Sequence, residues 1–382
     1  MIVLNEILYE SFRKGASNVF LKVGIPPMFR IAEHLQSSDS DPVSKVEIEE
    51  LVESLLTDTL KDKLQAEHDV SFTYLIENAG LFYLTISKAD GTFCLATKFI
   101  PSKIPSISAL NLPLILEKVL TSNSGLILVT GPAGSGRSTT IAACIDWINR
   151  SRTEHIISVE SPIEYAHKSR KSIVSHLEQI EGESNISLFR RARKLSPDVI
   201  QFGTLESQDD VVELLSIAES GVLVVASMNT LSSARTIDRI VDMFPESEHP
   251  SIRTRLSSSL VAVLSQILVG RRSCVADSLL EPCFQKQVAA SELMINTPAI
   301  ANLIREGKSA QIYSAIQMSV NQGMQTLEAS LASLVKTGQI DHEEALLKTT
   351  RPDDLNRFVA PKGPQGPEDN PPGAAALRRP SA

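Results

Sequence analysis

The sequence predicts an α/β protein whose core is a mainly parallel sheet carrying a phosphate-binding loop. Two observations lead to this fold class. The apolar run Gly125–Thr130 has the length of a strand, and it leads through a glycine-rich segment into an amphipathic helix over Ser138–Asn149. Further strand-like runs alternate with helical ones, which is typical of a parallel sheet; these runs are Ile156–Val159, Val199–Phe202 and Val222–Ala226.

A smaller domain is expected before this core, because 382 residues are too many for one ordinary hydrophobic core. Residues 1–100 are predicted to form it as an α+β unit. Asp41 followed by Pro42 predicts the start of a helix, and strands are expected after it at Val70–Leu75, Leu81–Ile86 and Phe93–Ile100. Residues 101–122 contain three prolines and are predicted to be a linker.

The core is expected to span residues 123–270 and to be followed by a helical region over 271–358. The apolar spacing from Ile252 to Ile267 predicts one long amphipathic helix. Shorter helices are expected at about 298–307, 309–321, 323–337 and 341–348. Residues 359–382 are rich in proline and glycine and poor in large apolar side chains, so we expect a disordered tail.

Composition narrows the class of protein. A formal net charge of -8 and a pI near 5.5 argue against a nucleic-acid binder. The four cysteines are scattered and do not predict a disulfide framework. The sequence contains neither a signal-peptide pattern nor an apolar run of the ~20 residues that a membrane span needs. We therefore expect a cytoplasmic protein.

A phosphate-binding loop is predicted between the strand ending at Thr130 and the following helix. Its glycines let successive backbone N–H groups point into one concavity, and the start of the helix adds further unpaired N–H groups. We expect it to bind ATP with Mg²⁺, the Ser138 hydroxyl being the metal ligand. The predicted binding residues are Gly131, Pro132, Ala133, Gly134, Ser135, Gly136, Arg137, Ser138 and Thr139.

Arg137 stands where such loops usually have lysine. Lysine places a compact charge against the β and γ phosphates, whereas the guanidinium group is larger, planar and forked. The substitution keeps the positive charge, but it is expected to disturb the geometry around the γ-phosphate.

Several segments of the chain resemble the PilT-type retraction ATPases of type IV pili, within the secretion-ATPase superfamily. The resemblance covers about residues 1 to 350. The segments that carry it are the Walker A strand and loop Gly125–Gly136, the acidic box Val159–Glu164, the Walker B region Ser196–Gly203, and the segments Ala234–Pro245 and Thr297–Glu306.

This resemblance implies a PAS-like N-terminal domain, a RecA-like core and a helical C-terminal region. It also implies a homohexameric ring in which ATP binds between neighbouring subunits, and a role in pilus disassembly. The implied partners are other copies of this chain or an intact paralogous motor ATPase, together with an inner-membrane pilus platform protein. Peripheral association with the inner membrane would follow from these contacts.

The catalytic positions of the family are mostly not kept. The Walker B strand of the family ends in glycine and then glutamate, whereas this chain has Gly203 and then Thr204. A threonine cannot take up a proton from the attacking water. The two histidines of the family's His box fall on Val222 and Asn229. Glu160 and Glu164 of the acidic box remain as catalytic candidates.

Three functions are consistent with this pattern. The first is a nucleotide-binding subunit that is impaired in hydrolysis and serves as an accessory or regulatory partner of an active pilus motor. The second is an active motor that uses Arg137 on the phosphates and Glu160 or Glu164 as the base. The third is a nucleotide-free scaffold at the base of the pilus. The first is favoured, because the losses all affect one reaction while the packing positions are kept.

Overall fold

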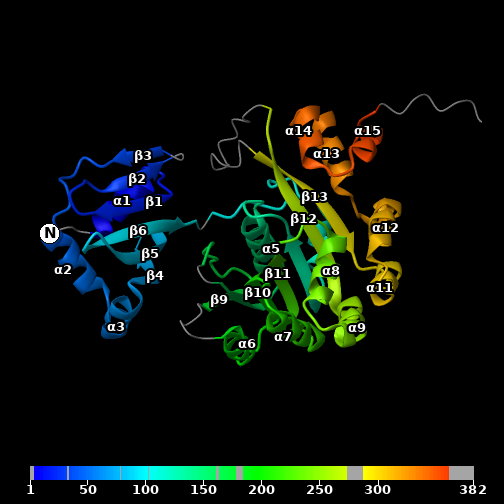
Figure 1. Cartoon of the computed structure of the whole chain (residues 1–382), viewed down its shortest axis with the longest axis horizontal. Coiled ribbons are helices and arrows are strands. Elements are labelled where there is room, and N and C mark those ends of the chain that lie inside the picture. Colours follow the sequence, from blue (N-terminus) through cyan, green and yellow to red (C-terminus); the bar gives the residue numbers. More distant parts are fainter. Residues whose placement is uncertain are drawn as a thin grey trace, which may run out of the picture.

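The computed structural model describes residues 4–31, 34–77, 79–101, 103–160, 163–177, 184–272 and 287–360. An N-terminal domain with one sheet is followed by a larger α/β unit with a second sheet and by a group of C-terminal helices (Figure 1). The predicted tail lies outside the described residues from residue 361 onward, and its first residue, Val359, still belongs to a helix.

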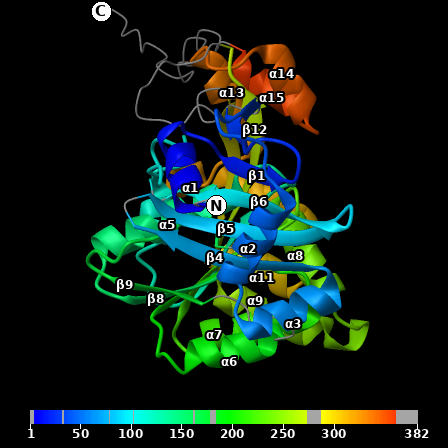
Figure 2. The ribbon, with the colours of Figure 1, turned by 90° about the vertical axis from the view of Figure 1, so that its left-hand side faces the viewer.

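The N-terminal domain contains a six-stranded antiparallel sheet in the order β3-β2-β1-β6-β5-β4. The apolar sides of its helices pack on that sheet, and the domain faces the viewer in Figure 2. The three predicted strands are confirmed as β4, β5 and β6. The elements are α1 (Leu4–Arg13), β1 (Asn18–Lys22), β2 (Met28–Ile31), β3 (His34–Ser37), α2 (Lys45–Leu55), α3 (Asp58–Glu67), β4 (Asp69–Ile76), β5 (Gly80–Ala89) and β6 (Thr92–Ile100).

The start predicted for α2 at Asp41 is wrong by three residues. Ser44 is the N-cap, and it forms a capping box with Glu47: the Glu47 N–H donates to Ser44 Oγ over 3.3 Å, and the Ser44 N–H donates to the Glu47 carboxylate over 3.1 Å. Val43 lies outside the helix, where its backbone oxygen accepts from the Gly24 N–H and its N–H donates to the Ile25 oxygen. The two reciprocal hydrogen bonds between Ser44 and Glu47 therefore determine where the helix begins, rather than Asp41 and Pro42.

The second sheet has seven strands in the order β13-β12-β7-β11-β10-β8-β9. All neighbours run parallel except β12 and β13, which are antiparallel. The strands predicted by the alternating pattern are confirmed. The bounds are β7 (Gly125–Thr130), β8 (His155–Val159), β9 (Ile173–Leu177), β10 (Val199–Thr204), β11 (Leu223–Met228), β12 (Leu260–Gly270) and β13 (Gln287–Ile295).

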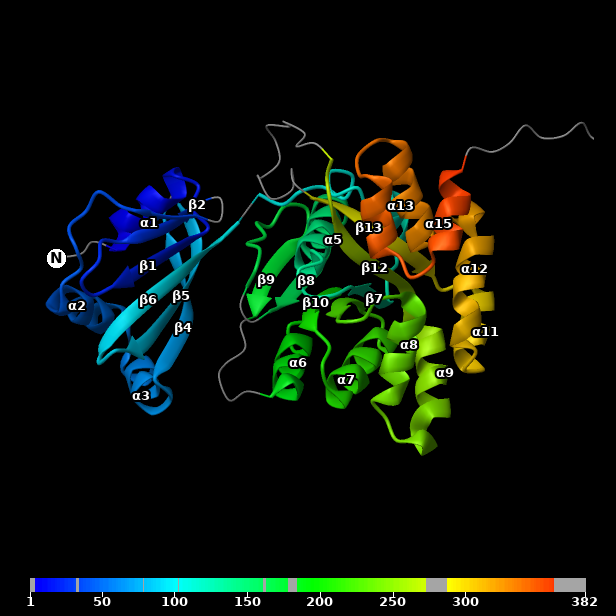
Figure 3. The same ribbon diagram turned by 45° about the horizontal axis from the view of Figure 1, so that its top comes forward.

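Helices cover both faces of this sheet (Figure 3). One face packs against α5 (Arg137–Ser151), α4 (Ile115–Val119) and part of the predicted linker, whose Ile107 and Leu112 are buried there. The linker is therefore a packed part of the core rather than a free connection. The other face is covered by α6 (Asn185–Arg193), α7 (Gln208–Glu219), α8 (Ser233–Asp242) and α9 (His249–Ser259).

The long helix predicted over Ile252–Ile267 is wrong. Helix α9 ends at Ser259, and β12 begins at Leu260 between β7 and β13. The run from Leu260 onward is almost entirely buried, and the apolar spacing of a strand covered on both faces does not differ from that of a buried helix. The core sheet also continues past the expected boundary at Gly270, because β13 pairs with β12.

The remaining C-terminal elements agree with the four predicted helices, and α15 is a further helix that was not predicted. They are α11 (Pro298–Arg305), α12 (Ile312–Met318), α13 (Leu327–Lys336), α14 (His342–Lys348) and α15 (Pro352–Val359), with short 3₁₀ turns at Glu246–Glu248, Ser309–Gln311 and Val320–Gln322. Among the helices that the structure describes, none is long and apolar enough to cross a bilayer.

Gly125, which begins β7, is predicted to be required for the core. Its φ is +112°, and a Cβ added there would lie 2.8 Å from the backbone oxygen of Ser259. Gly221 has a similar φ of +101° but open space around it. We expect Gly221→Ala to cost about 1–2 kcal/mol of unfolding free energy, and Gly125→Ala to cost about 2 kcal/mol more because of overpacking. Chemical denaturation measures both, and equal costs would contradict the steric account.

Candidate functional site

The predicted phosphate-binding loop connects the carboxyl end of β7 to the amino end of α5. Gly131, Gly134 and Gly136 have φ values of +153°, +76° and +84°, which other residues rarely adopt. At Gly131 an added Cβ would lie 2.3 Å from the backbone oxygen of Gln266. The first N–H groups of α5 have no partner within the helix and are oriented toward the loop. The loop thus has the geometry of an anion cradle.

Two polar atoms of the loop are buried and have no hydrogen-bond partner within the described part of the chain: Ser135 Oγ and Arg137 Nη1. Burial lowers the pKa of Arg137, and the nearby negative charge of Glu164 opposes that effect. A buried donor without a partner is costly unless a ligand or water satisfies it. A bound phosphate group would supply acceptors for both atoms, so the residues present fit a nucleotide phosphate.

Gln266 of β12 holds the loop in place. Its Nε2 donates to the backbone oxygen of Ser135 over 2.6 Å, and its Oε1 accepts from Thr140 Oγ1 over 2.8 Å. One buried amide group therefore connects the loop to the first turn of α5. Gln266 was not predicted as a site residue, because the apolar spacing around it predicted a helix rather than the strand beside β7.

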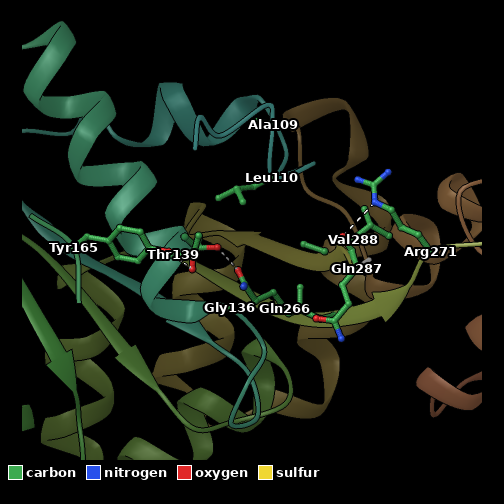
Figure 4. Close-up of a pocket in the computed structure, with 12 residues that line it drawn as sticks. Ala109, Leu110, Gly136, Thr139, Tyr165, Gln266, Arg271, Gln287 and Val288 are labelled. Carbon is green, nitrogen blue, oxygen red and sulfur yellow. Dashed lines mark hydrogen bonds between the residues drawn. The ribbon is translucent and has the colours of Figure 1, made fainter. Parts of the chain in front are cut away.

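A cavity of about 230 Å³ lies beside the first turn of α5 (Figure 4). One side is apolar and includes Leu110, Leu268 and Val288. The other side is polar, and there Thr139 Oγ1 lies 2.8 Å from Tyr165 Oη. This hydrogen bond attaches the segment after β8 to the predicted binding residue Thr139. No sequence pattern around Tyr165 indicates that it belongs to the site.

The two acidic-box candidates lie in contact with each other after the end of β8. Glu160 follows the end of β8 and is largely buried, which raises the pKa of its carboxyl group to about 7. Gln201 Nε2 donates to Glu160 Oε1, and the Glu164 N–H donates to Glu160 Oε2 over 3.4 Å. Glu164 in turn lies close enough to Arg137 to affect its pKa.

Thr204 ends β10 and lines a second cavity of about 270 Å³ together with Glu160 and Glu206. Its hydroxyl group lies 3.0 Å from Ser227 Oγ of β11. Glu206 is exposed and was missed by the sequence analysis, which compared only the position directly after Gly203. The cavity therefore contains two carboxyl groups even though residue 204 supplies none.

The two positions of the His box are not brought together. Asn229 directly follows β11, at the same edge of the sheet as the phosphate-binding loop. Val222 precedes β11, and its backbone oxygen accepts from the Gly125 N–H at the start of β7. The strand between them spans roughly 20 Å at ~3.3 Å per residue. Val222 therefore cannot contact a nucleotide on the loop of its own chain.

Among the described residues, no group of three or more His, Cys, Asp or Glu side chains is arranged to hold a metal ion. The described cysteines, Cys94 and Cys144, are free thiols. Cys274 and Cys283 lie outside the described residues.

Comparisons with known proteins identify the family. The family described as "Type II/IV secretion system protein" matches residues 109–347. The chain is 35% identical over 353 residues to the type IV pilus retraction ATPase PilT of Pseudomonas aeruginosa, covering 92% of this chain and 99% of that protein. It is 28% identical to the type IV pilus ATPase PilU of the same organism, covering 91% and 88%.

A solved structure gives the same result. The crystal structure of the pilus retraction motor PilT with bound ADP matches with a TM-score of 0.83 at 35% identity, covering 94% of this chain and 100% of that one. The chain therefore belongs to the type II/IV secretion ATPase family. Within that family it belongs to the group that contains the PilT and PilU ATPases of type IV pili.

The stability of the protein is predicted to fall in acid because of two histidines beside this site, of which His167 is buried and His176 is partly buried. Their rings stack with centroids 5.9 Å apart, and both nitrogens of His167 are buried without a partner in the described structure. Burial and the neighbouring His176 lower the pKa of His167 to about 3, and burial lowers that of His176. The unfolded chain binds these protons near pH 6.5, so stability is present above that pH and is lost as the pH falls toward 3.

Urea unfolding between pH 7 and pH 4 measures this effect. Below pH 6 we expect His167→Gln to reduce the pH dependence of the unfolding free energy by about 1 kcal/mol per pH unit. Equal slopes for the variant and the unchanged protein would contradict the assignment.

Proposed function

We propose that this protein is a nucleotide-binding subunit of a type IV pilus retraction motor, with weak ATP hydrolysis and an accessory or regulatory role. The observation that supports it best is the contrast within one site. The cradle of glycines is kept and Ser135 Oγ and Arg137 Nη1 have no partner among the described residues, while Thr204 at the end of the Walker B strand has no acidic group.

The nucleotide phosphates would lie in the loop 131–136, against the N–H groups at the start of α5. Arg137 Nη1 and Ser135 Oγ, which have no hydrogen-bond partner in the described part of the chain, would gain acceptors there. The base would lie in the cavity between Leu110 and Leu268, which adjoins the loop through Gly136 and Thr139. Ser138 would hold Mg²⁺ with its hydroxyl oxygen, and that ion neutralises phosphate charge when bound.

Slow hydrolysis follows from the groups around the attacking water. The hydroxyl group of Thr204 can form hydrogen bonds, as it does with Ser227, but it cannot accept a proton at neutral pH. Loss of a general base typically costs 10²–10⁴-fold in rate. Arg137 presents a larger, partly buried cation with Glu164 nearby, so less of its charge is available to a γ-phosphate.

We further propose that the protein works in a ring, most simply a hexamer, formed with copies of itself or with an intact paralogous motor ATPase. The similarity to PilT and PilU along nearly the whole chain supports this assembly. In that setting the chain would act in the cytoplasm, at the inner membrane, through the pilus platform protein. Nucleic acid is not proposed as a partner, because the net charge is -8.

One observation favours the alternative of an active motor with rearranged residues. Glu160, with its raised pKa, and Glu206 line the cavity that Thr204 also lines, so carboxyl groups are present where the family residue is missing. A general base with a pKa near neutral is suited to its task. This arrangement supports residual hydrolysis.

Restoring the two lost groups is expected to raise the rate of hydrolysis. The double variant Thr204→Glu with Arg137→Lys should increase steady-state ATP turnover at least about tenfold, because a carboxylate regains access to the attacking water. Thr204→Gln with Arg137→Lys is the matched control, since it has the same shape without the base. No gain in the Glu variant, or an equal gain in the control, would contradict the proposed cause.

A further inference from the structure

A glutamine lies in the middle of a buried strand of the core sheet. Gln201 of β10 is 2% exposed and stands between Ile200 and Phe202, both buried. Its neighbours across the sheet are Ser158 of β8 and Val225 of β11. A buried amide group is unfavourable unless it is hydrogen-bonded, so its position requires a reason.

A hydrogen bond of its Nε2 provides that reason, whereas its Oε1 has no partner within the described part of the chain. Side chains two residues apart on a strand share a face, so Glu160 continues the face of β8 on which Ser158 lies beside Gln201. Gln201 Nε2 donates to Glu160 Oε1, and the backbone N–H of Glu164 donates to Glu160 Oε2. Each oxygen of the carboxyl group thus receives one N–H.

These two bonds determine where the carboxyl group lies. Glu160 lines the cavity at the carboxyl ends of β8 and β10, together with Thr204 and Glu206. The bond between Tyr165 and Thr139 holds the following segment against the first turn of α5. The carboxyl group of Glu160 therefore lies at the edge of the sheet from which the phosphate-binding loop also leaves β7, since β7, β11, β10 and β8 run parallel.

We propose that Gln201 is a positioning residue: it holds the Glu160 carboxylate in the cavity at Thr204, where Glu160 acts as the base for the residual hydrolysis of ATP. This inference rests on the proposed function, because it requires a nucleotide on the loop. A water oxygen attacks the γ-phosphorus while Glu160 takes a proton from that water. The bond between the γ-phosphorus and the bridging oxygen breaks, and ADP leaves with its electron pair.

The charged groups that face Glu160 determine its pH dependence. Glu164 is close to it along the chain, Glu206 lines the same cavity, and Arg137 lies near Glu164. Burial and the negative charge of Glu164 favour the neutral acid, whereas the Glu164 N–H, the Ser158 hydroxyl group and the Gln201 amide group favour the carboxylate. Removing the Gln201 donor must therefore move the ionisation of Glu160 to higher pH.

Single-turnover hydrolysis of labelled ATP by excess full-length protein, measured from pH 5.5 to 9, tests the proposal. We expect the rate to rise through a midpoint near pH 7, and Gln201→Met to shift that midpoint upward by at least about half a pH unit. The dissociation constant for ATP should stay within about twofold, because Gln201 does not line the nucleotide cavity. Val199→Ala, on the same face of β10, is the control and should keep the midpoint.

A second variant keeps the proposal testable if Gln201→Met does not fold. Gln201→Glu keeps the shape of the side chain, replaces the donor by another carboxyl group, and should also shift the midpoint upward. Glu160→Gln should abolish the pH-dependent rate. An unchanged midpoint in both Gln201 variants, or ATP binding without any hydrolysis, would overturn this inference and leave the proposed function standing. Failure to bind ATP at any pH would overturn both.

Discussion

The hydrogen bonds of Gln266 are the constraint on which the nucleotide site depends. Its amide group connects a loop oxygen at Ser135 with the side chain of Thr140, so β12 fixes both the glycine loop and the first turn of α5. The position of β12 beside β7 makes this possible. Gly131 lies so close to β12 that an added Cβ would be 2.3 Å from the backbone oxygen of Gln266. A displacement of this strand would therefore open the cradle.

Around this cradle the structure separates binding from catalysis. The backbone groups that would hold phosphates depend on glycine conformations and on a helix terminus, and both are retained. Hydrolysis would depend instead on single side chains at the ends of β10 and β11, where the resemblance implies a glutamate and a histidine and this chain has Thr204 and Asn229. Thr204 and Asn229 leave the packing of the sheet intact, so the exchange of the family's residues at these two positions does not change the fold. We propose that such a subunit occupies a place in a motor and responds to nucleotide without driving the motor itself.

The sequence predicted the core strands and the loop, because each is a local pattern of apolar or glycine residues. It failed where the pattern was ambiguous: the run after Leu260 is buried on both faces, and its spacing fits helix and strand equally. Gln266, Tyr165 and Gln201 could not be predicted as parts of the site. Their contacts join residues from distant segments of the chain, and a single polar residue within an apolar run gives no indication of its partner.

Nucleotide binding and turnover measured on the same purified full-length protein test the central claim most directly. The account predicts saturable binding of ATP in the presence of Mg²⁺, with a steady-state turnover well below about 1 s⁻¹, the lower end of ordinary enzyme rates. Turnover at or above that rate would contradict the assignment as an impaired subunit and would favour an active motor. Absence of binding would contradict the cradle itself and would leave a scaffold.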